Sequence, residues 1–460
     1  MTNLKLLIAG VPLVTVIMVG AAGAQFLARD PGVRGGGPGA GAHLAGLTAS
    51  QRVFFDVGSD EFREVDGLGE GLGPRFNLDS CVGCHSQPAV GGTSPAVNPQ
   101  VAVATAFGAR NTVPPFITND GPVREARFKR KADGTPDGGV HGLFVISGRN
   151  EGTPDADASG CTIRQPNFER QLANDNVIFR IPTPMFGAGL IEQIPDAAIV
   201  ANQRANASVK ASLGIVGRPN RIRITGEANN NGNDGTIARF GWKAQNKSLL
   251  LFSGEAYNVE MGITNELFQT ERDETPACQL VTTPNNVTNT DSTTGAEAIS
   301  AIERFAFFMR FLGPPHPSPN MPGGAASIDR GRTTFGVIGC ALCHTPTLYT
   351  GASTVQALDT KPVNLFSDLL LHNMGPGLAD EVSQGEALGD EFRTSPLWGL
   401  GKRLFFLHDG RTSDLIVAIR AHKSAGNAQF KASEAYAIVD RFNALPEPQK
   451  QDLVNFLRSL

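Results

Sequence analysis

The hydrophobic positions near the end of the chain recur with helical spacing. In residues 447–460, Leu453, Phe456, Leu457 and Leu460 fall on one face of a helix. Residues 325–335 and 414–421 can also form short helices. These three elements lie in one continuous stretch of the chain, so the pattern predicts a helical domain at residues 325–460.

Between residues 46 and 312 the periodic pattern is interrupted by long polar stretches, at about 90–115, 229–235 and 282–294. Such stretches are typical of loops, and 53 glycines and 30 prolines among 460 residues agree with this interpretation. We therefore predict a mainly α fold with long irregular loops, in which an N-terminal domain at 46–312 carries large loop insertions. A proline-rich stretch that ends in glycine, residues 313–324, is the predicted linker.

The first 24 residues have the pattern of a secretory signal peptide. Lys5 supplies a positive charge, residues 6–20 are apolar, and Ala22-Gly23-Ala24 matches a cleavage site. We expect a mature protein from Gln25 with a flexible segment at 25–45. The alternative is an uncleaved membrane anchor, although the apolar run is near the lower limit for crossing a bilayer. No membrane span is expected after the signal is removed.

The sequence Cys-Xaa-Xaa-Cys-His occurs twice, at 81–85 and at 340–344. Two thiols at this spacing can add to the two vinyl groups of a haem, and the next histidine then lies beneath the iron. A structural zinc site needs two CxxC pairs close enough to share one ion, and a thioredoxin-like site does not use the paired histidines. The sequence therefore predicts two covalently bound haem c groups. The first is held by Cys81, Cys84 and His85, and the second by Cys340, Cys343 and His344.

Haem is attached to this motif outside the cytoplasmic membrane, so the motif and the signal peptide both predict an exported, periplasmic protein. Cys161 and Cys278 remain after the four haem cysteines are assigned. In an oxidising compartment two spare cysteines most simply form one disulfide, here between two polar, turn-rich stretches. Two free thiols are the alternative.

The charge and one polar motif limit the possible ligands. A net charge of −4 and an isoelectric point near 6.1 argue against nucleic acid or an anionic membrane surface as a partner. The asparagine-rich stretch 229–235 resembles a calcium loop but lacks the closing bidentate glutamate. We expect a turn there, and calcium is the weaker alternative.

Further characteristic segments occur at 73–77, 186–192, 239–244, 260–264, 369–376, 392–398 and 408–411. They resemble the di-haem c-type oxidoreductase family of peroxidases, which is similar to bacterial di-haem cytochrome c peroxidases and to MauG enzymes. The resemblance covers residues of about 46–460. It implies two cytochrome c-like haem domains, the first with an open haem face for peroxide and the second with a six-coordinate haem that transfers electrons.

The resemblance also implies a distal ligand for the second iron. In the peroxidases a phenylalanine is followed after sixteen residues by a histidine, and the distal ligand stands fourteen residues further on. Here these positions are Phe392, His408 and His422, so we predict ligation by His344 and His422. Met374 is the alternative, because a loop methionine is a common haem ligand in cytochromes c.

In the first haem domain the resemblance points to an acid–base residue and an electron relay. The peroxidases have a tryptophan about twenty residues before a Glu-Met-Gly sequence, and here Trp242 precedes Glu260 by eighteen. The implied roles are proton transfer at peroxide for Glu260 and electron transfer between the haems for Trp242. A surface carboxylate and a core aromatic are the alternatives. We expect Trp398, the other tryptophan, to pack in the second haem pocket.

The chain departs from the family at one position. The peroxidases carry a glutamine between this tryptophan and this glutamate, and the matching residue here is Ser253. Its hydroxyl can bind peroxide but reaches less far than an amide. Glu255 or Gln245 could substitute for the missing glutamine.

These features together predict a periplasmic enzyme that reduces hydrogen peroxide with electrons from a small cytochrome or cupredoxin. Two other functions remain open. One is a MauG-like oxidase of a protein or organic substrate, and the other is a non-enzymatic two-haem electron carrier.

Overall fold

The computed structural model describes residues 26–222 and 236–460. The predicted signal peptide and the asparagine-rich stretch 229–235 lie outside the described residues. The α-helices of the described part are α1 (Ala49–Glu61), α2 (Cys81–Cys84), α3 (Gln100–Val103), α4 (Phe168–Ala173), α5 (Ala188–Glu192), α6 (Asp196–Arg204), α7 (Ala207–Ser212), α8 (Leu249–Met261), α9 (Gly295–Ala298), α10 (Ala301–Phe311), α11 (Gly324–Ile338), α12 (Leu415–Ala421), α13 (Tyr436–Ala444) and α14 (Glu447–Ser459).

Short 3-10 helices and short strands complete the structure. The 3-10 helices are η1 (Leu68–Glu70), η2 (Ala106–Gly108), η3 (Pro154–Ala156), η4 (Pro276–Cys278), η5 (Cys340–Leu342) and η6 (Leu400–Lys402). The strands are β1 (Arg75–Phe76), β2 (Glu125–Phe128), β3 (Val140–His141), β4 (Phe144–Val145), β5 (Val177–Arg180), β6 (Asn220–Ile222), β7 (Thr236–Ala238), β8 (Leu348–Tyr349), β9 (Pro362–Val363), β10 (Leu371–Asn373) and β11 (Glu391–Arg393).

The strands pair in small antiparallel sheets, β1 with β4, β6 with β7, β8 with β9, β10 with β11, and β3-β2-β5 as a three-stranded sheet. Helices make up 33% and strands 11% of the structure, so its class is mixed rather than mainly α. Long irregular connections join the elements, as the sequence predicts. The strands were missed because elements of two to four residues are too short to produce a recognisable alternation.

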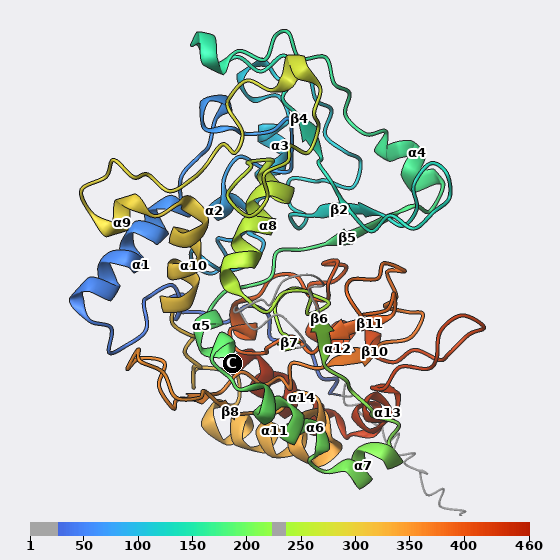
Figure 1. Cartoon of the computed structure of the whole chain (residues 1–460). Helices are drawn as coiled ribbons and strands as arrows, with labels where there is room; N and C mark the ends of the chain where they lie inside the picture. The colour runs from blue at the N-terminus through green and yellow to red at the C-terminus, as the bar shows by residue number, and fades with distance from the viewer. Residues whose placement is uncertain (1–25, 223–235) are drawn as a thin grey trace, which may run out of the picture.

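The three predicted C-terminal helices are confirmed as α11, α12 and α14. α12 is capped by Asp414, whose side chain accepts a hydrogen bond from the backbone N–H of Val417 at 2.9 Å. α11 and α14 pack closely where Gly331 meets α14, because a Cβ at this position would lie 2.0 Å from the carbonyl oxygen of Asp452. This helix pair forms the base of the lower part in Figure 1.

In the upper part, α10 packs against α1 and against α8 through aromatic side chains. The ring of Phe62, just after α1, lies 6.1 Å from Phe305 and 5.0 Å from Phe308 of α10, measured between centroids. The C-terminus of α8 is held by two backbone hydrogen bonds, from Gly73 N to Met261 O at 3.0 Å and from Asn77 N to Glu260 O at 2.7 Å. The first Cys-Xaa-Xaa-Cys-His motif therefore lies directly beside the end of α8.

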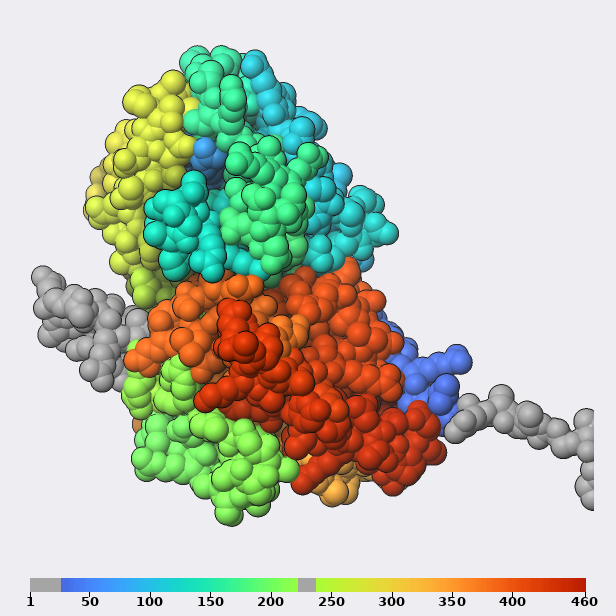
Figure 2. All heavy atoms as spheres, turned by 90° about the vertical axis from the view of Figure 1, so that its right-hand side faces the viewer, coloured from blue at the N-terminus to red at the C-terminus, as the bar shows by residue number. Residues whose placement is uncertain are grey.

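A segment of the predicted N-terminal domain lies with the C-terminal half. The backbone N–H of Gly351 donates to Gln193 O at 2.9 Å, and Arg218 and Leu371 exchange two backbone hydrogen bonds of 2.9 and 2.8 Å. Figure 1 shows α5, α6 and α7 beside α11 and β8, and in Figure 2 the green residues of about 190–220 adjoin the red C-terminal residues. The sequence gives no sign that residues of about 190–220 contact the C-terminal half. The domain boundary at 313–324 stays a prediction.

Residues 26–45, predicted as a flexible segment, pack against the C-terminal helices in the structure. The Asp30 carboxylate pairs with Arg458 of α14 at 2.6 Å and accepts the backbone N–H of Leu415 at 2.7 Å. The backbone N–H of Arg34 donates to Gly401 O at 2.8 Å. Asp30 and Arg458 are nearly fully buried, so this ion pair belongs to the interior.

Two further predictions concern the chain as a whole. Cys161 and Cys278 are joined by a disulfide and are both buried. Among the described residues, no helix is both long enough and apolar enough to pass through a bilayer.

Candidate functional site: two cavities at the Cys-Xaa-Xaa-Cys-His motifs

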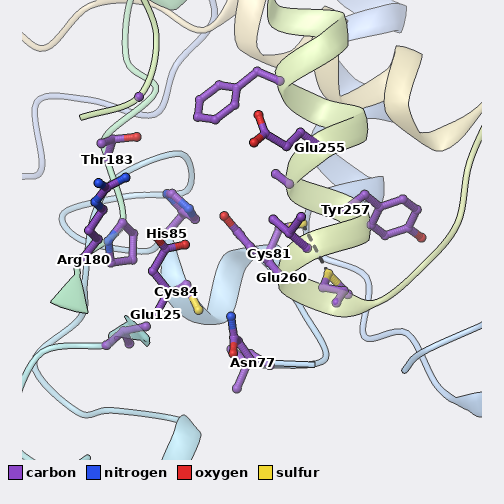
Figure 3. A pocket seen from close by; sticks show the side chains of 18 of the residues that line it. Asn77, Cys81, Cys84, His85, Glu125, Arg180, Thr183, Glu255, Tyr257 and Glu260 are labelled. Carbon is purple, nitrogen blue, oxygen red and sulfur yellow. Dashed lines mark hydrogen bonds between the residues drawn. The ribbon is translucent and has the colours of Figure 1, made fainter. Parts of the chain in front are cut away.

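The first motif borders a cavity in the upper part of the molecule. α2 spans Cys81–Cys84, His85 follows it directly, and the two cysteines and the histidine line one wall. α8 and the strands β2 and β5 supply other walls (Figure 3). The cavity has a volume of about 1190 Å³, which includes space open to solvent.

The hydrogen bonding and protonation of His85 suit a ligand that binds a metal ion through one ring nitrogen. Its Nδ1–H donates a hydrogen bond to the carbonyl oxygen of Gly92 at 3.0 Å, so the neutral ring leaves Nε2 without a proton. Burial lowers the pKa of His85 to about 4. The imidazole is therefore neutral at pH 7, which is the form that ligates iron.

Glu260 projects from α8 into the space in front of His85 (Figure 3). Ser253, Ala256 and Glu260 follow one another at helical spacing, so they share the face of α8 that lines the cavity. Burial, together with the neighbouring Glu125 and Glu255 carboxylates, raises the pKa of Glu260 to about 8, although Arg127 opposes this shift. A carboxyl group with a pKa near neutrality, at the edge of a cavity, is suited to proton transfer.

The sheet opposite α8 supplies charged groups that sequence reasoning missed. Glu125 and Arg127 alternate on β2, so they lie on one face and form an ion pair of 2.7 Å. Arg180 of β5 stands directly opposite Glu125 in the strand register and pairs with Asp380 of the C-terminal half at 2.7 Å. Glu125, Arg127 and Arg180 all line the first cavity. Sequence offered no signal for them, because only the strand pairing brings them together.

The three candidates for the missing glutamine differ in what they already bind. The Ser253 hydroxyl donates to Leu249 O, one turn back in α8, at 2.8 Å. The Glu255 carboxylate accepts a hydrogen bond from the Asn246 side-chain amide. The Oε1 atom of Gln245 is buried and has no hydrogen-bond partner in the described part of the chain, although Gln245 lines the cavity.

The second motif borders another cavity, in the lower part. η5 carries Cys340, and Cys343 and His344 follow it along the cavity wall. This cavity has a volume of about 1420 Å³, open solvent included, and its wall is mostly apolar. His344 Nδ1 donates to the carbonyl oxygen of Phe366 at 3.0 Å, and burial together with the nearby His422 lowers the pKa of His344 to about 4.

His422 and Met374 both line this second cavity. His422 directly follows α12, and its Nδ1 donates to the carbonyl oxygen of Ala418 at 2.8 Å, which leaves Nε2 free. Burial lowers the pKa of His422, and its charge would in turn lower the pKa of His344, so the two imidazoles are close. Met374 follows β10 and is almost fully buried. Both predicted ligands, His422 and Met374, therefore lie at the second cavity, and their positions do not decide between them.

Trp242 lines both the first and the second cavity. Its Nε1–H donates to the carbonyl oxygen of Ile181 at 2.9 Å, and its ring meets the His408 ring edge to face at 6.4 Å. His408 in turn stacks on Phe392 with centroids 4.4 Å apart. In the sequence, Phe392 and His408 were used only to locate His422 by its spacing from them. In the structure both residues line the second cavity together with Trp242.

The structure places Trp398 elsewhere than predicted. It lies against Gly187, where a Cβ would be 2.6 Å from the indole ring. It lines a third cavity, of about 580 Å³, together with Trp242, but it is not part of the wall of the second cavity. The sequence prediction was wrong because proximity to His408 along the chain does not fix the direction of the side chain.

His372 was missed as a charged group of the second cavity. Its Nδ1 lies 2.7 Å from a Glu434 carboxylate oxygen, and its Nε2 lies 2.9 Å from an Asp368 carboxylate oxygen. Although burial opposes the charged form, negative charge on an unmodified Cys343 sulfur and on the Asp368 carboxylate raises the pKa of His372 well above its usual value. Cys343, Asp368 and His372 are also the group that the described residues offer for a metal ion. Cys343 is needed for the haem motif, so we treat His372 as a hydrogen-bonded cation.

The donor groups fit two haem c molecules. Each cavity combines a pair of thiols, a neutral histidine whose Nδ1 is bonded to a backbone carbonyl oxygen, and a large, mostly apolar wall. Structural zinc would require four donors around one point. Thiols and one histidine beside a large cavity fit a planar, mostly apolar cofactor instead.

Comparison with known families agrees with this class of site. Residues 129–460 match the family described as "Di-haem oxidoreductase, putative peroxidase". The match covers more than half of the chain, and the protein therefore belongs to the di-haem oxidoreductase family. The family assignment implies haem cofactors. The matched region includes the second motif and begins after the first.

Solved structures and curated proteins add little to this assignment. The chain has 12% identity and a TM-score of 0.35 to hydrazine synthase of Kuenenia stuttgartiensis, a structure obtained under xenon pressure, over 98% of this chain and 100% of that chain. It has 21% identity and a TM-score of 0.24 to a MauG-like protein associated with microbial copper homeostasis, over 36% of this chain and 54% of that chain. No curated protein matches the sequence.

Proposed function

We propose that this chain is an exported, periplasmic di-haem c-type peroxidase that reduces hydrogen peroxide with electrons from a small cytochrome or cupredoxin. The observation that carries the proposal is the position of Trp242, which forms part of the wall of both cavities, while the proton-transferring carboxyl group of Glu260 lines only the first. The first cavity thus has a group for acid–base chemistry, and the second has several candidate iron ligands. Trp242 forms a wall that the two cavities share.

The second haem site would be held by Cys340, Cys343 and His344, with His422 as the distal ligand and Met374 as the alternative. The first would be held by Cys81, Cys84 and His85. When bound, the two haems would supply iron centres that accept and release single electrons.

The side chains of the first cavity perform the proton chemistry. Reduction of one hydrogen peroxide to two waters consumes two electrons and two protons. The ionised Glu260 takes the proton from one peroxide oxygen and delivers it to the departing oxygen as the O–O bond breaks. The free Oε1 of Gln245 can accept a hydrogen bond from peroxide or water, which favours Gln245 over Ser253 as the substitute for the family's glutamine.

Electrons enter at the second cavity and leave it through the wall that it shares with the first. The Trp242 ring donates its Nε1–H to the carbonyl oxygen of Ile181 and lines both cavities, which supports a role as the relay. An aromatic side chain that touches both cavities shortens the gaps that an electron must cross.

The optical and electron paramagnetic resonance spectra of the purified ferric protein, together with peroxide turnover, test the proposal. We expect one high-spin and one low-spin haem, with turnover supported by a reduced small redox protein. Two low-spin haems without turnover would indicate an electron carrier. The same spin states without peroxide reduction, but with peroxide-dependent oxidation of a partner, would indicate a MauG-like oxidase.

The double variant Cys81→Ala/Cys84→Ala should retain one covalent haem, because the second motif is complete by itself. Mass spectrometry of the intact protein should show one haem addition in this variant and two in the unmodified protein. The matched variant Cys340→Ala/Cys343→Ala should also show one. Loss of both haems in either variant would mean that the two sites do not mature independently.

Trp242→Phe should slow electron transfer between the haems while both haem spectra stay near normal. The phenylalanine ring is smaller than the indole, so it cannot contact both cavities as fully, and the gaps that an electron must cross become longer. The measurement is the rate at which the first haem is reduced after rapid reduction of the second. Trp398→Phe is the matched control, since this equally buried tryptophan lines neither haem cavity. An unchanged rate in Trp242→Phe would show that this residue only packs.

A further inference from the structure

Two buried arginines, Arg393 and Arg403, lie on the wall that the second cavity shares with the third. Arg393 ends β11, and Arg403 follows η6. Each side chain is only 8% exposed. Arg393 is also tied to the relay residue, because its backbone N–H donates to Trp242 O at 2.9 Å and its Nε donates to Gly241 O at 2.9 Å.

Neither arginine has a carboxylate partner in the described part of the chain. The remaining hydrogen bond of Arg393, from Nη1 to Thr394 O, is long at 3.4 Å. The guanidinium of Arg403 has no hydrogen bond or ion pair with any described residue. Four other buried arginines, Arg149, Arg180, Arg239 and Arg458, each pair with an aspartate or glutamate. The buried Arg34 has no carboxylate partner among the described residues, but its guanidinium donates to the carbonyl oxygen of His316 at 2.7 Å.

The two guanidinium groups also act on each other electrostatically. Burial, followed by the positive charge of Arg403, lowers the pKa of Arg393 to about 10. Burial lowers the pKa of Arg403 to about 10 as well. Two buried cations on one cavity wall, without a carboxylate partner, are unfavourable. Negative charge bound in the cavity that both residues line would offset this cost.

We propose that Arg393 and Arg403 bind the two propionate carboxylates of the second haem, and so turn the propionate edge of that haem toward Trp242. The proposal rests on haem binding as proposed above. Two guanidinium groups match two carboxylates in number and charge, and each can form a bidentate pair. Neither arginine lines the first cavity, so the propionates of the first haem are not the expected partners.

This arrangement has a measurable consequence for the second haem. A nearby positive charge stabilises the ferrous form relative to the ferric form, because reduction adds one electron. Removing either cation should therefore lower the reduction potential of the second haem. Coulomb's law with an effective dielectric constant near 20 and a separation of roughly 10 Å gives a change of about tenfold in the reduction equilibrium. About tenfold corresponds to about 59 mV for one electron.

The test is a spectroelectrochemical titration of the haem-loaded variants Arg403→Gln, Arg393→Gln and Arg403→Lys. Intact-protein mass spectrometry first establishes that each variant carries two haems. We expect the second haem to shift toward the oxidised form by about tenfold in each glutamine variant and by less in Arg403→Lys, which keeps the charge. Arg330→Gln is the control, because this exposed arginine of α11 pairs with Asp452 and should leave both potentials unchanged.

Three results would overturn the proposal. The first is a fully loaded Arg403→Gln protein with an unchanged second-haem potential. The second is a shift confined to the first haem, which would assign the arginines there. The third applies if Arg403→Gln does not fold, and is an unchanged second-haem potential in fully loaded Arg393→Gln. Unmodified protein with fewer than two haems by mass would instead contradict the proposed function.

Discussion

Peroxide turnover should fall by roughly 10²–10⁴-fold when Glu260 is replaced by glutamine, the usual contribution of a general acid–base group. The amide has nearly the same shape, so it can line the cavity, but it cannot accept and return a proton. Both haems should remain attached, and their ferric spectra should change little. Steady-state peroxide consumption with a reduced electron donor measures the effect.

The pH profile of the same reaction gives a second expected result. The pKa of Glu260 is raised to about 8, chiefly by burial, so below this pH the group is mostly protonated and cannot accept the peroxide proton. Turnover at low peroxide concentration should therefore rise as the pH increases through about 8 in the unmodified protein. Glu260→Gln should lack this rise.

Two matched substitutions separate Glu260 from its neighbours. Glu169→Gln alters an exposed glutamate of α4 and should leave turnover unchanged. Glu255→Gln alters the other glutamate of α8 in this cavity, which is already hydrogen-bonded to Asn246. A full-rate Glu260→Gln enzyme would exclude Glu260 from proton transfer, and a large loss in Glu255→Gln alone would transfer the role to Glu255.

The second haem should change from low-spin to high-spin when His422 is replaced by alanine. His422 lines the cavity with its Nδ1 bonded to the carbonyl oxygen of Ala418, so its Nε2 would be available to the iron, and its loss would leave His344 as the only protein ligand. His422→Met should restore six-coordination and raise the potential, because a thioether stabilises ferrous iron more than an imidazole does. Optical and electron paramagnetic resonance spectra report the spin state.

Met374→Leu is the matched control for this prediction. Leucine preserves the apolar volume of a buried side chain in the same cavity but cannot ligate iron. The second haem should stay low-spin in this variant. The reverse pattern, low-spin in His422→Ala and high-spin in Met374→Leu, would assign the distal position to Met374.

The local chemistry of this protein could be predicted from its sequence. Both Cys-Xaa-Xaa-Cys-His motifs and the three C-terminal helices are encoded by short spacings or by helical periodicity. Family spacing also identified Glu260 and Trp242 as candidates. These features depend on residues that are close in sequence, so tertiary structure is not needed to recognise them. The disulfide between Cys161 and Cys278 spans 117 residues and was predicted by elimination, because these are the two cysteines outside the motifs.

Only the tertiary structure decided how these parts work together. The ion pairs of Arg180 with Asp380 and of Asp30 with Arg458 join residues at least 200 positions apart, and no local pattern signals them. The same holds for the wall that Trp242 shares between two cavities. The protonation state of Glu260 and the unpaired charges of Arg393 and Arg403 depend on burial and on distant neighbours. Burial and electrostatic interaction are properties of the packed molecule, and the linear order of residues does not contain them.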